Sequence, residues 1–193
     1  MTHDELIPIY ERLQSQGYGS NQTDAMRAHH IVDWLKDQTP RPTTLLDASC
    51  GRGQVLVQAK VNQIEPEGTE ASGWLIENEL AKLYTVHHLR YSELRTLGES
   101  RYDAVVSNDV LEHLLSEDEA TDAIAALASL ARLYLCFAVC SKMAQRNVDG
   151  QRVILHNLIR PTEWWRTAIG HVCEIEEDQA FRNTHFFFGR KRK

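Results

Sequence analysis

The alternation of strand-like and helix-like segments along the chain is the feature that most constrains its fold. The residue pattern predicts strands over 44–47, 73–76, 85–89, 102–108, 133–139, 171–177 and 184–190. It predicts helices over 21–38, 54–64, 78–84, 116–131 and 161–170, with a loop over 66–72. Because strand and helix alternate over most of the 193 residues, we expect an α/β fold. The predicted architecture is a doubly wound, mostly parallel sheet of seven strands with helices on both faces.

Composition limits the partners that the chain can have. Its formal charge of −6 at pH 7 argues against a general affinity for nucleic acid or anionic membranes, because both favour a basic surface. The first residues, "MTHDELIPIYERL", contain acids where a secretory signal has a basic start, and the apolar run 133–140 is too short to span a bilayer. We therefore expect a cytoplasmic protein without membrane contact, in which the four cysteines are free thiols.

The stretch "LLDASCGRG" (45–53) joins the first predicted strand to a helix. Glycines at 51 and 53 remove the Cβ atoms that would keep a ligand away from the backbone N–H groups of the turn and of the helix N-terminus. Such turns also occur for packing reasons alone. The dinucleotide pattern G-x-G-x-x-G is absent, since position 49 is serine and position 56 is leucine, and no P-loop lysine follows.

This stretch resembles the first motif of the class I S-adenosylmethionine-dependent methyltransferases, an apolar strand followed by an acid and a small-Cys-Gly-x-Gly turn. "SGWLIEN" (72–78) is similar to the family's second strand with its terminal acid, and "RYDAVVSNDVLEHL" (101–114) to its fourth strand and the following loop. "HNLIRPTEWW" (156–165) resembles a segment of small methyltransferases that act on saccharides and related molecules. The resemblance covers most of residues 44–165 and implies a Rossmann-like fold, S-adenosylmethionine as the cofactor and methyl transfer as the activity.

The length fits one methyltransferase domain, which we divide into three parts. Residues 1–40 form a helical cap or lid, in which Asn21 is one possible cap of the helix over 21–38. Residues 41–188 form the Rossmann-like core. Residues 189–193, "GRKRK", form a basic tail that we expect to be a solvated end.

We expect nine cofactor-binding residues in this chain, eight from the family's motifs and one, Tyr18, from the predicted lid. These are Asp47, Ser49, Gly51, Gly53, Glu77, Asn108, Asp109, Val110 and Tyr18. Ser49 stands where the family's loop has its first glycine, and Tyr18 belongs to the predicted lid. A carboxylate accepts both hydroxyls of a ribose in charge-assisted hydrogen bonds. We assign that role to Glu77, which directly follows the apolar run "WLI", in preference to Glu79 and Glu70.

Two histidines are candidates for the general base that a hydroxyl acceptor requires, because histidine is the commonest base at neutral pH. His156 follows the fifth strand, a region that lines the acceptor site in this family, and is the first choice. A histidine hydrogen-bonded to the backbone for structural reasons is the alternative. His113, in "LEHL", is expected to be structural or close to the cofactor.

No metal site is predicted. His87 and His88 are neighbours on a predicted strand and point to opposite faces, while His29 and His30 lack the i, i+4 spacing of helical metal ligands. The remaining pair, Cys136 and Cys140, is expected to consist of buried small hydrophobes.

The expected function is methyl transfer to a hydroxyl of a small molecule or saccharide. A nucleic-acid methyltransferase is one alternative, supported only by the basic tail, since "SNDV" (107–110) replaces the N-P-P-Y type of motif used to methylate base amino groups. A protein that binds S-adenosylmethionine without catalysis, or serves as a partner subunit, is a second alternative, suggested by Ser49. A nicotinamide-dependent enzyme is disfavoured by the missing G-x-G-x-x-G. The oligomeric state is not predicted.

Overall fold

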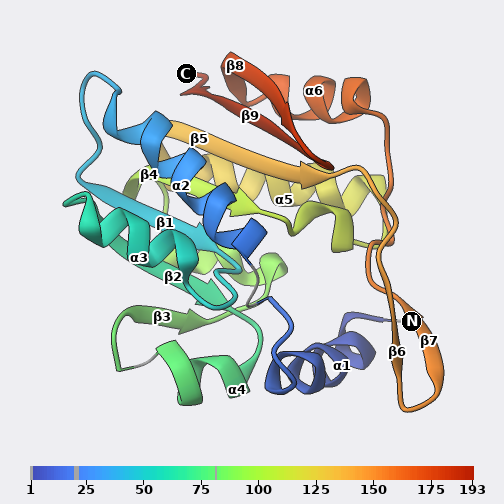
Figure 1. Cartoon of the computed structure of the whole chain (residues 1–193). Helices are drawn as coiled ribbons and strands as arrows, with labels where there is room; N and C mark the ends of the chain where they lie inside the picture. Colours follow the sequence, from blue (N-terminus) through green and yellow to red (C-terminus); the bar gives the residue numbers. More distant parts are fainter. Residues whose placement is uncertain (1, 20–21, 81) are drawn as a thin grey trace.

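The computed structural model describes residues 2–19, 22–80 and 82–193 and has a sheet covered by helices on both faces (Figure 1). The strands are β1 (Thr44–Ala48), β2 (Glu65–Glu70), β3 (Thr85–His88), β4 (Tyr102–Asn108), β5 (Ala131–Cys140), β6 (Gln145–Val148), β7 (Gln151–Ile154), β8 (Cys173–Phe181) and β9 (Thr184–Lys191). The α-helices are α1 (His3–Ser15), α2 (Gln22–Lys36), α3 (Gln54–Val61), α4 (Gly73–Leu75), α5 (Glu117–Leu130) and α6 (Thr162–Gly170). Other helical turns are η1 (Ile76–Leu80), η2 (Tyr91–Leu97) and η3 (Leu111–His113).

The main sheet has seven strands in the order β3-β2-β1-β4-β5-β9-β8. The pairs from β3 to β5 are parallel, and β9 and β8 close the sheet as antiparallel strands. This confirms the predicted doubly wound, mostly parallel sheet. The strand order reverses at β1, which lies between β2 and β4, and ligands of open α/β sheets bind at the carboxyl ends of the strands at such a point.

Neighbouring side chains of β1 point to opposite faces of the sheet and belong to separate hydrophobic clusters. Leu45 packs in a cluster with Ile31 and Leu35 of α2, whereas Leu46 packs with residues of α5 such as Leu127. The helix α2 is therefore a layer of the core and is no part of a lid, in contrast to the predicted cap over 1–40. The proposed capping by Asn21 lies outside the described residues.

The second strand of the sheet is the main error of the sequence prediction. Residues 65–70, predicted mostly as a loop, form β2, while 73–76, predicted as a strand, begin the helical segment α4 and η1. Ser72 caps that helix, since its side chain accepts a hydrogen bond from the backbone N–H of Leu75. A Cβ at Gly68 of β2 would lie 2.8 Å from Sγ of Cys50, so β2 packs closely against the glycine loop. This tertiary packing outweighs the low strand propensity of residues 65–70. The predicted helix over 78–84 is reduced to the end of η1 and a turn, and its residue 81 lies outside the described part of the chain.

The chain between β5 and α6 forms a hairpin, β6–β7, that the sequence pattern did not predict. It packs against α1 through a small cluster that includes Leu6, Leu13, Val153 and Leu155 (Figure 1). The tail was also wrongly predicted, because β9 continues to Lys191, whose Nζ donates to the carbonyl oxygen of Ala131 at 2.9 Å.

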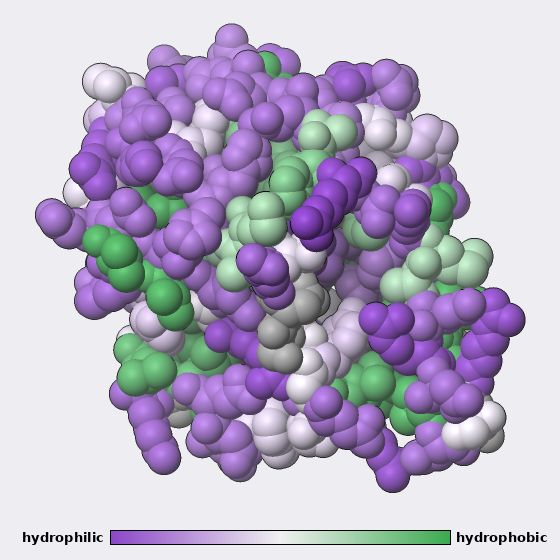
Figure 2. All heavy atoms as spheres, viewed as in Figure 1, coloured by the Kyte–Doolittle hydropathy of each residue, from purple (hydrophilic) through white to green (hydrophobic). Residues whose placement is uncertain are grey.

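The other predicted elements are confirmed with small changes at their ends. Ser116 caps α5 by accepting a hydrogen bond from the N–H of Glu119, which is half of the predicted capping box; the Glu119 carboxylate accepts instead from the N–H of Leu115. The four cysteines are buried free thiols. The surface is hydrophilic over most of the face shown in Figure 2. In the described ranges, every helix is too short or too polar to cross a lipid bilayer.

Gly189 tests the packing of the closing strands. A Cβ at this position would lie 2.0 Å from the carbonyl oxygen of Glu174, so alanine cannot be accommodated without separating β9 from β8. We expect Gly189→Ala to lower the free energy of unfolding by about 3 kcal/mol or more. Gly170→Ala is the matched control, because a Cβ at Gly170 meets no atom within 4 Å. Equal urea midpoints for the two variants would contradict this packing.

Candidate functional site

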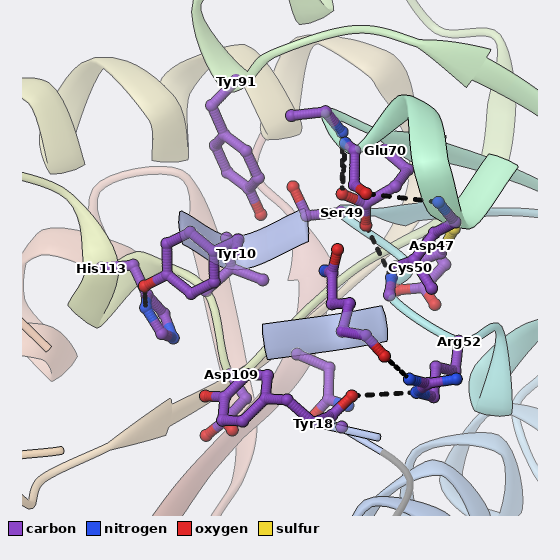
Figure 3. Close-up of a pocket in the computed structure, with 18 of the residues that line it drawn as sticks. Tyr10, Tyr18, Asp47, Ser49, Cys50, Arg52, Glu70, Tyr91, Asp109 and His113 are labelled. Atoms are coloured by element: carbon purple, nitrogen blue, oxygen red, sulfur yellow. Dashed lines mark hydrogen bonds between the residues drawn. The ribbon is translucent and has the colours of Figure 1, made fainter. Parts of the chain in front are cut away.

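A cavity of about 520 Å³ lies where the carboxyl ends of the parallel strands meet (Figure 3). Its walls come from the glycine loop after β1, the end of β2, the residues after β4, and the start of α2. The helix α1, strand β6 and the chain after β7 contribute further side chains, and so do α4, η2 and α5. The volume falls in the usual range for small-molecule and cofactor sites.

The glycine loop turns β1 into α3 through three residues with positive φ. Ser49, Gly51 and Gly53 have φ values of 59°, 53° and 75°. A Cβ at Gly53 would lie 2.9 Å from Cδ2 of Leu80, so glycine is needed there for space as well as for conformation. Ser49 also adopts the left-handed conformation, which glycine takes up more readily than other residues. The loop therefore accommodates a serine at the position where a glycine was expected.

The end of β2 fixes the glycine loop through hydrogen bonds to successive backbone N–H groups. The N–H of Ser49 donates to Oγ1 of Thr69 at 3.0 Å, and that of Cys50 donates to the Thr69 carbonyl at 2.8 Å. The N–H of Gly51 donates to Oε2 of Glu70 at 2.9 Å. The loop is thus held in place by the strand that the sequence analysis took for a loop.

Glu70, and not Glu77, is the acid at the end of the second strand. Its carboxylate is buried and also accepts hydrogen bonds from the N–H groups of Ala71 and Ser72, each at 2.9 Å. Burial raises the pKa of Glu70, and these N–H donors oppose that rise. Glu77 lies on η1 and does not line the cavity, so our assignment of the ribose role to Glu77 is wrong in its placement. The signal that would have found Glu70 is its position at the end of a strand adjacent to β1.

Asp47 lies at the base of the cavity with an oxygen that no protein group satisfies. It is 2% exposed, and among the described residues its Oδ1 has no hydrogen-bond partner. Burial, and next the nearby Glu70, raise the pKa of the Asp47 carboxyl well above its usual range. Oδ1 of Asn108, at the end of β4, is likewise buried without a partner in the described part of the chain. Two acceptors directed at one cavity require donors from a ligand or from water.

The turn after β4 places Asp109 and Val110 in the cavity wall, as predicted. Asp109 has a φ of 63° and accepts a hydrogen bond from the guanidinium of Arg27 at 2.8 Å. Arg27 also binds Asp24 at 2.5 Å, so its charge is already balanced by two acids. Burial, and next the neighbouring Asp109, raise the pKa of Glu112 well above its usual range, which favours a proton on that buried carboxyl.

The two predicted histidines meet in the same wall of the cavity, with ring centroids 4.7 Å apart. Nδ1 of His113 lies 2.5 Å from the hydroxyl of Tyr10, and burial lowers the pKa of His113 to about 4. Nδ1–H of His156 donates to the carbonyl oxygen of Lys142 at 2.5 Å. Burial lowers the pKa of His156 too, while this hydrogen bond opposes the shift. His156 is therefore a neutral histidine whose Nε2 carries a lone pair.

The segment that follows α1 is tied to the glycine loop by Arg52. Its Nε donates to the carbonyl oxygen of Tyr18 at 2.9 Å, and its other nitrogens bind the Gln14 carbonyl and the Glu79 carboxylate. Tyr18 lines the cavity as predicted. Tyr10 and Arg52 were missed by the sequence analysis, since residues separated by tens of positions gave no local pattern that would pair them.

Glu112, Cys140 and His156 form the group in the described chain that comes nearest to a metal site, with potential ligand atoms within 4.8 Å of one another. Oε1 of Glu112 accepts a hydrogen bond from the N–H of Cys140 at 2.8 Å, and His156 binds Lys142 as described above. These hydrogen bonds engage one atom of each side chain, and Oε2 of Glu112 is buried without a partner in the described part of the chain.

The model of a protein family described as "Methyltransferase domain" matches residues 21–186. No curated protein sequence matches the chain. Among solved structures, a protein of Pyrococcus horikoshii OT3 superposes with a TM-score of 0.74 at 12% identity, covering 90% of this chain and 92% of that one. A 1,6-didemethyltoxoflavin N1-methyltransferase of Burkholderia thailandensis, solved with 1,6-didemethyltoxoflavin and S-adenosylhomocysteine, has a TM-score of 0.70 at 17% identity over 100% and 92% of the two chains. A sugar N-methyltransferase of a Streptoalloteichus species has a TM-score of 0.70 at 19% identity over 94% and 92%. These structures share the fold.

Replacing Asp47 tests whether its carboxylate is an unbalanced buried charge. A carboxyl with a raised pKa in the folded state binds more protons than in the unfolded state, so the stability it confers falls as pH rises above the ordinary aspartate range. We expect Asp47→Asn to raise the free energy of unfolding of the ligand-free protein by about 1 kcal/mol or more at pH 8, and by less at pH 5. Exposed Asp37→Asn is the control and should change neither value. A destabilised Asp47→Asn variant at pH 8 would refute this reading.

Proposed function

The chain belongs to the methyltransferase domain family, and on that premise we propose that it binds S-adenosylmethionine in this cavity and methylates a hydroxyl group of a small molecule or saccharide. The observation that carries the proposal is the composition of the cavity. An unsatisfied buried carboxylate oxygen belongs to Asp47, and two neutral histidines line the same cavity. Figure 3 shows Asp47 and His113 on opposite sides of it.

The unsatisfied acceptors fit the donors of S-adenosylmethionine. The oxygens of Asp47 and Asn108 accept from its ammonium group, and the negative charge of Asp47 favours a ligand that carries a sulfonium cation. Asp47 and Glu70, which lie together at this end of the cavity and form no ion pair with a basic side chain of the described residues, give it the negative charge that such a cation requires. S-adenosylmethionine is thus the cofactor that the residues of this cavity suit best.

The Glu70 carboxylate accepts hydrogen bonds from the ribose hydroxyls of the cofactor. Of its two oxygens, Oε1 accepts two backbone N–H groups and Oε2 accepts one, so Oε2 keeps a lone pair for a hydroxyl donor. Three backbone donors fix the carboxylate before the ligand arrives, which lowers the entropic cost of binding.

When bound, S-adenosylmethionine supplies a methyl group on a positively charged sulfur. The protein holds the acceptor oxygen in line with that methyl carbon and excludes water, and such positioning accounts for a large part of the catalysis. The acceptor oxygen forms a bond to carbon as the carbon–sulfur bond breaks and sulfur keeps the electron pair. The hydroxyl proton leaves to Nε2 of His156, and the products are a methyl ether and S-adenosylhomocysteine.

His156 is better suited than His113 to serve as this base. The hydrogen bond to Lys142 fixes the tautomer of His156 that leaves Nε2 unprotonated. His113 has a pKa of about 4 and its Nδ1 is engaged with the Tyr10 hydroxyl, so it is a weak base in a structural contact. We therefore assign proton transfer to His156 and orientation of Tyr10 to His113.

The acceptor is a small molecule because α1 and the β6–β7 hairpin cover the cavity on the side away from the sheet. Solved structures that share the fold include enzymes named for a toxoflavin precursor and for a sugar. The charge of −6 disfavours a nucleic-acid acceptor. The buried free thiols fit the reducing cytoplasm, where we place the reaction.

The first experiment is calorimetric titration with S-adenosylmethionine, S-adenosylhomocysteine and NAD, followed by transfer of a radiolabelled methyl group to a panel of small hydroxyl compounds. Micromolar binding of both adenosyl ligands without binding of NAD, and label in at least one product, support the proposal. Binding without transfer to any acceptor supports the non-catalytic alternative. Failure of both adenosyl ligands to bind refutes the cofactor assignment.

Glu70→Gln and Glu77→Gln separate the two candidates for the ribose acid. We expect the dissociation constant for S-adenosylmethionine to rise about 10- to 100-fold in Glu70→Gln, the loss of about 1.4 to 3 kcal/mol that one charge-assisted hydrogen bond provides. The control Glu77→Gln should leave it unchanged, because Glu77 does not line the cavity. If only Glu77→Gln weakens cofactor binding, Glu77 and not Glu70 binds the ribose.

The pH profile of turnover tests the base. A histidine with a lowered pKa stays unprotonated down to a lower pH. The midpoint of the acidic limb of kcat/KM should therefore lie below pH 6.5, the ordinary pKa of histidine. His156→Gln should remove this limb and lower kcat about 100-fold, within the range of general-base contributions, with an unchanged dissociation constant for the cofactor. His113→Gln is the comparison and should retain the limb. Full turnover of His156→Gln would exclude its role as the base.

A further inference from the structure

Four rings form a continuous row in the part of the cavity near His156. The ring centroids of Tyr18 and Tyr10 lie 6.5 Å apart, those of Tyr10 and His113 lie 5.5 Å apart, and those of His113 and His156 lie 4.7 Å apart. All four side chains line the cavity, although they come from α1 and its following turn, from η3 and from the chain after β7. We call these residues the ring row.

The ring row is uncharged at neutral pH. Burial raises the pKa of Tyr18 to about 12 and raises that of Tyr10 as well, and both histidines have lowered pKa values. Neutral aromatic faces and edges bind planar rings better than they bind hydrated polar groups.

Three polar atoms of the ring row are already hydrogen-bonded within the protein. The Tyr10 hydroxyl is engaged with His113, and Nδ1 of His156 with Lys142. The nearby acids Asp24 and Asp109 are paired with Arg27. A saccharide, whose many hydroxyls each need a partner, finds few of them here.

Next to the ring row, Arg146 is an exposed cationic side chain that has no carboxylate partner in the described residues. Its guanidinium lies 5.7 Å from the ring centroid of Tyr18, and Arg146 lines the cavity from strand β6. Its guanidinium donates a hydrogen bond to the backbone carbonyl of Gln145 at 3.0 Å, and in the described part of the chain no carboxylate forms an ion pair with it. Arg27, by contrast, is bound by two acids.

We infer that the acceptor is a planar aromatic molecule with both a hydroxyl and an anionic group, and that Arg146 determines this specificity. This inference rests on the proposed methyl transfer. The aromatic ring packs against the ring row, the carboxylate or other anion pairs with Arg146, and the hydroxyl faces Nε2 of His156. A guanidinium binds a carboxylate in two parallel hydrogen bonds, which orients the ring as well as attracting it.

The test uses matched acceptor pairs that differ only in charge. Hydroxybenzoates and hydroxycinnamates are compared with their amides and with neutral sugars as acceptors of radiolabelled methyl groups. We expect kcat/KM to be about 10- to 100-fold higher for an acid than for its amide, the discrimination that one charge-assisted pair provides. Equal or greater transfer to amides or sugars would overturn the inference, and so would cofactor binding without transfer to any of the acids.

Arg146→Gln and Arg152→Gln are the matched variants, because Arg152 lies on the same hairpin, is exposed and does not line the cavity. Arg146→Gln should raise KM for the acid about 10- to 100-fold while kcat, transfer to the amide and the dissociation constant for S-adenosylmethionine stay unchanged. Arg152→Gln should change none of these. Weaker binding of the cofactor to Arg146→Gln would assign the arginine to the cofactor and overturn the inference.

The binding of 4-hydroxybenzoate in the presence of S-adenosylhomocysteine gives a readout that does not depend on turnover. We expect it to raise the Tm of the wild-type protein and of Arg152→Gln but not that of Arg146→Gln. If the wild-type protein does not bind S-adenosylmethionine, the proposed function itself is contradicted. Normal cofactor binding with no charge preference would contradict only the choice of acceptor.

Discussion

The hydrogen bonds between the end of β2 and the backbone of the glycine loop are the interaction on which the site depends. Thr69 and Glu70 bind three successive N–H groups of a loop that must pass through left-handed conformations. Without these partners the buried N–H groups would be left unsatisfied, and α3 would lose its position relative to β1. The same contacts bring Glu70 close to Asp47 and concentrate negative charge at one end of the cavity.

That concentration of charge explains why the two ends of the cavity differ in chemistry. At the strand ends, carboxylates are buried without balancing cations, which costs stability in the ligand-free protein and favours a cationic ligand. Near the hairpin, burial instead keeps histidines and tyrosines neutral. One physical cause, the removal of side chains from water, thus acts in opposite ways at the two ends: it disfavours the charge of the carboxylates at one end and keeps the rings at the other end neutral.

The sequence was sufficient to predict elements whose residues alternate or run continuously in the manner of buried strands. β4, β5 and the closing strands follow that rule, and the residues after β4 were correctly placed in the cavity wall. β2 failed because its sequence, "EPEGTE", has the composition of a turn and is a strand only through pairing with β1 and close contact at Gly68. The apolar run at 74–76 favoured the strand prediction, and this error placed the acid at the strand end at Glu77 although it is Glu70. The pairing of Tyr10 with His113 was beyond sequence reasoning, since distant segments create it. The β6–β7 hairpin was missed although its turn, Asp149-Gly150, is a local sequence signal.

Arg52 gives the site a mechanical property as well as a structural one. Its side chain leaves the glycine loop and binds two backbone carbonyls of the N-terminal segment, those of Gln14 and Tyr18. This guanidinium, together with the side chain of Gln54, which donates to the Gly19 carbonyl, therefore joins the glycine loop and the start of α3 to the N-terminal segment over the cavity, and separating the two breaks these bonds. Exchange of the spent cofactor is in this way linked to the lifetime of a contact that takes no part in the chemistry, so the rate of product release can evolve at Arg52 independently of the methyl-transfer step.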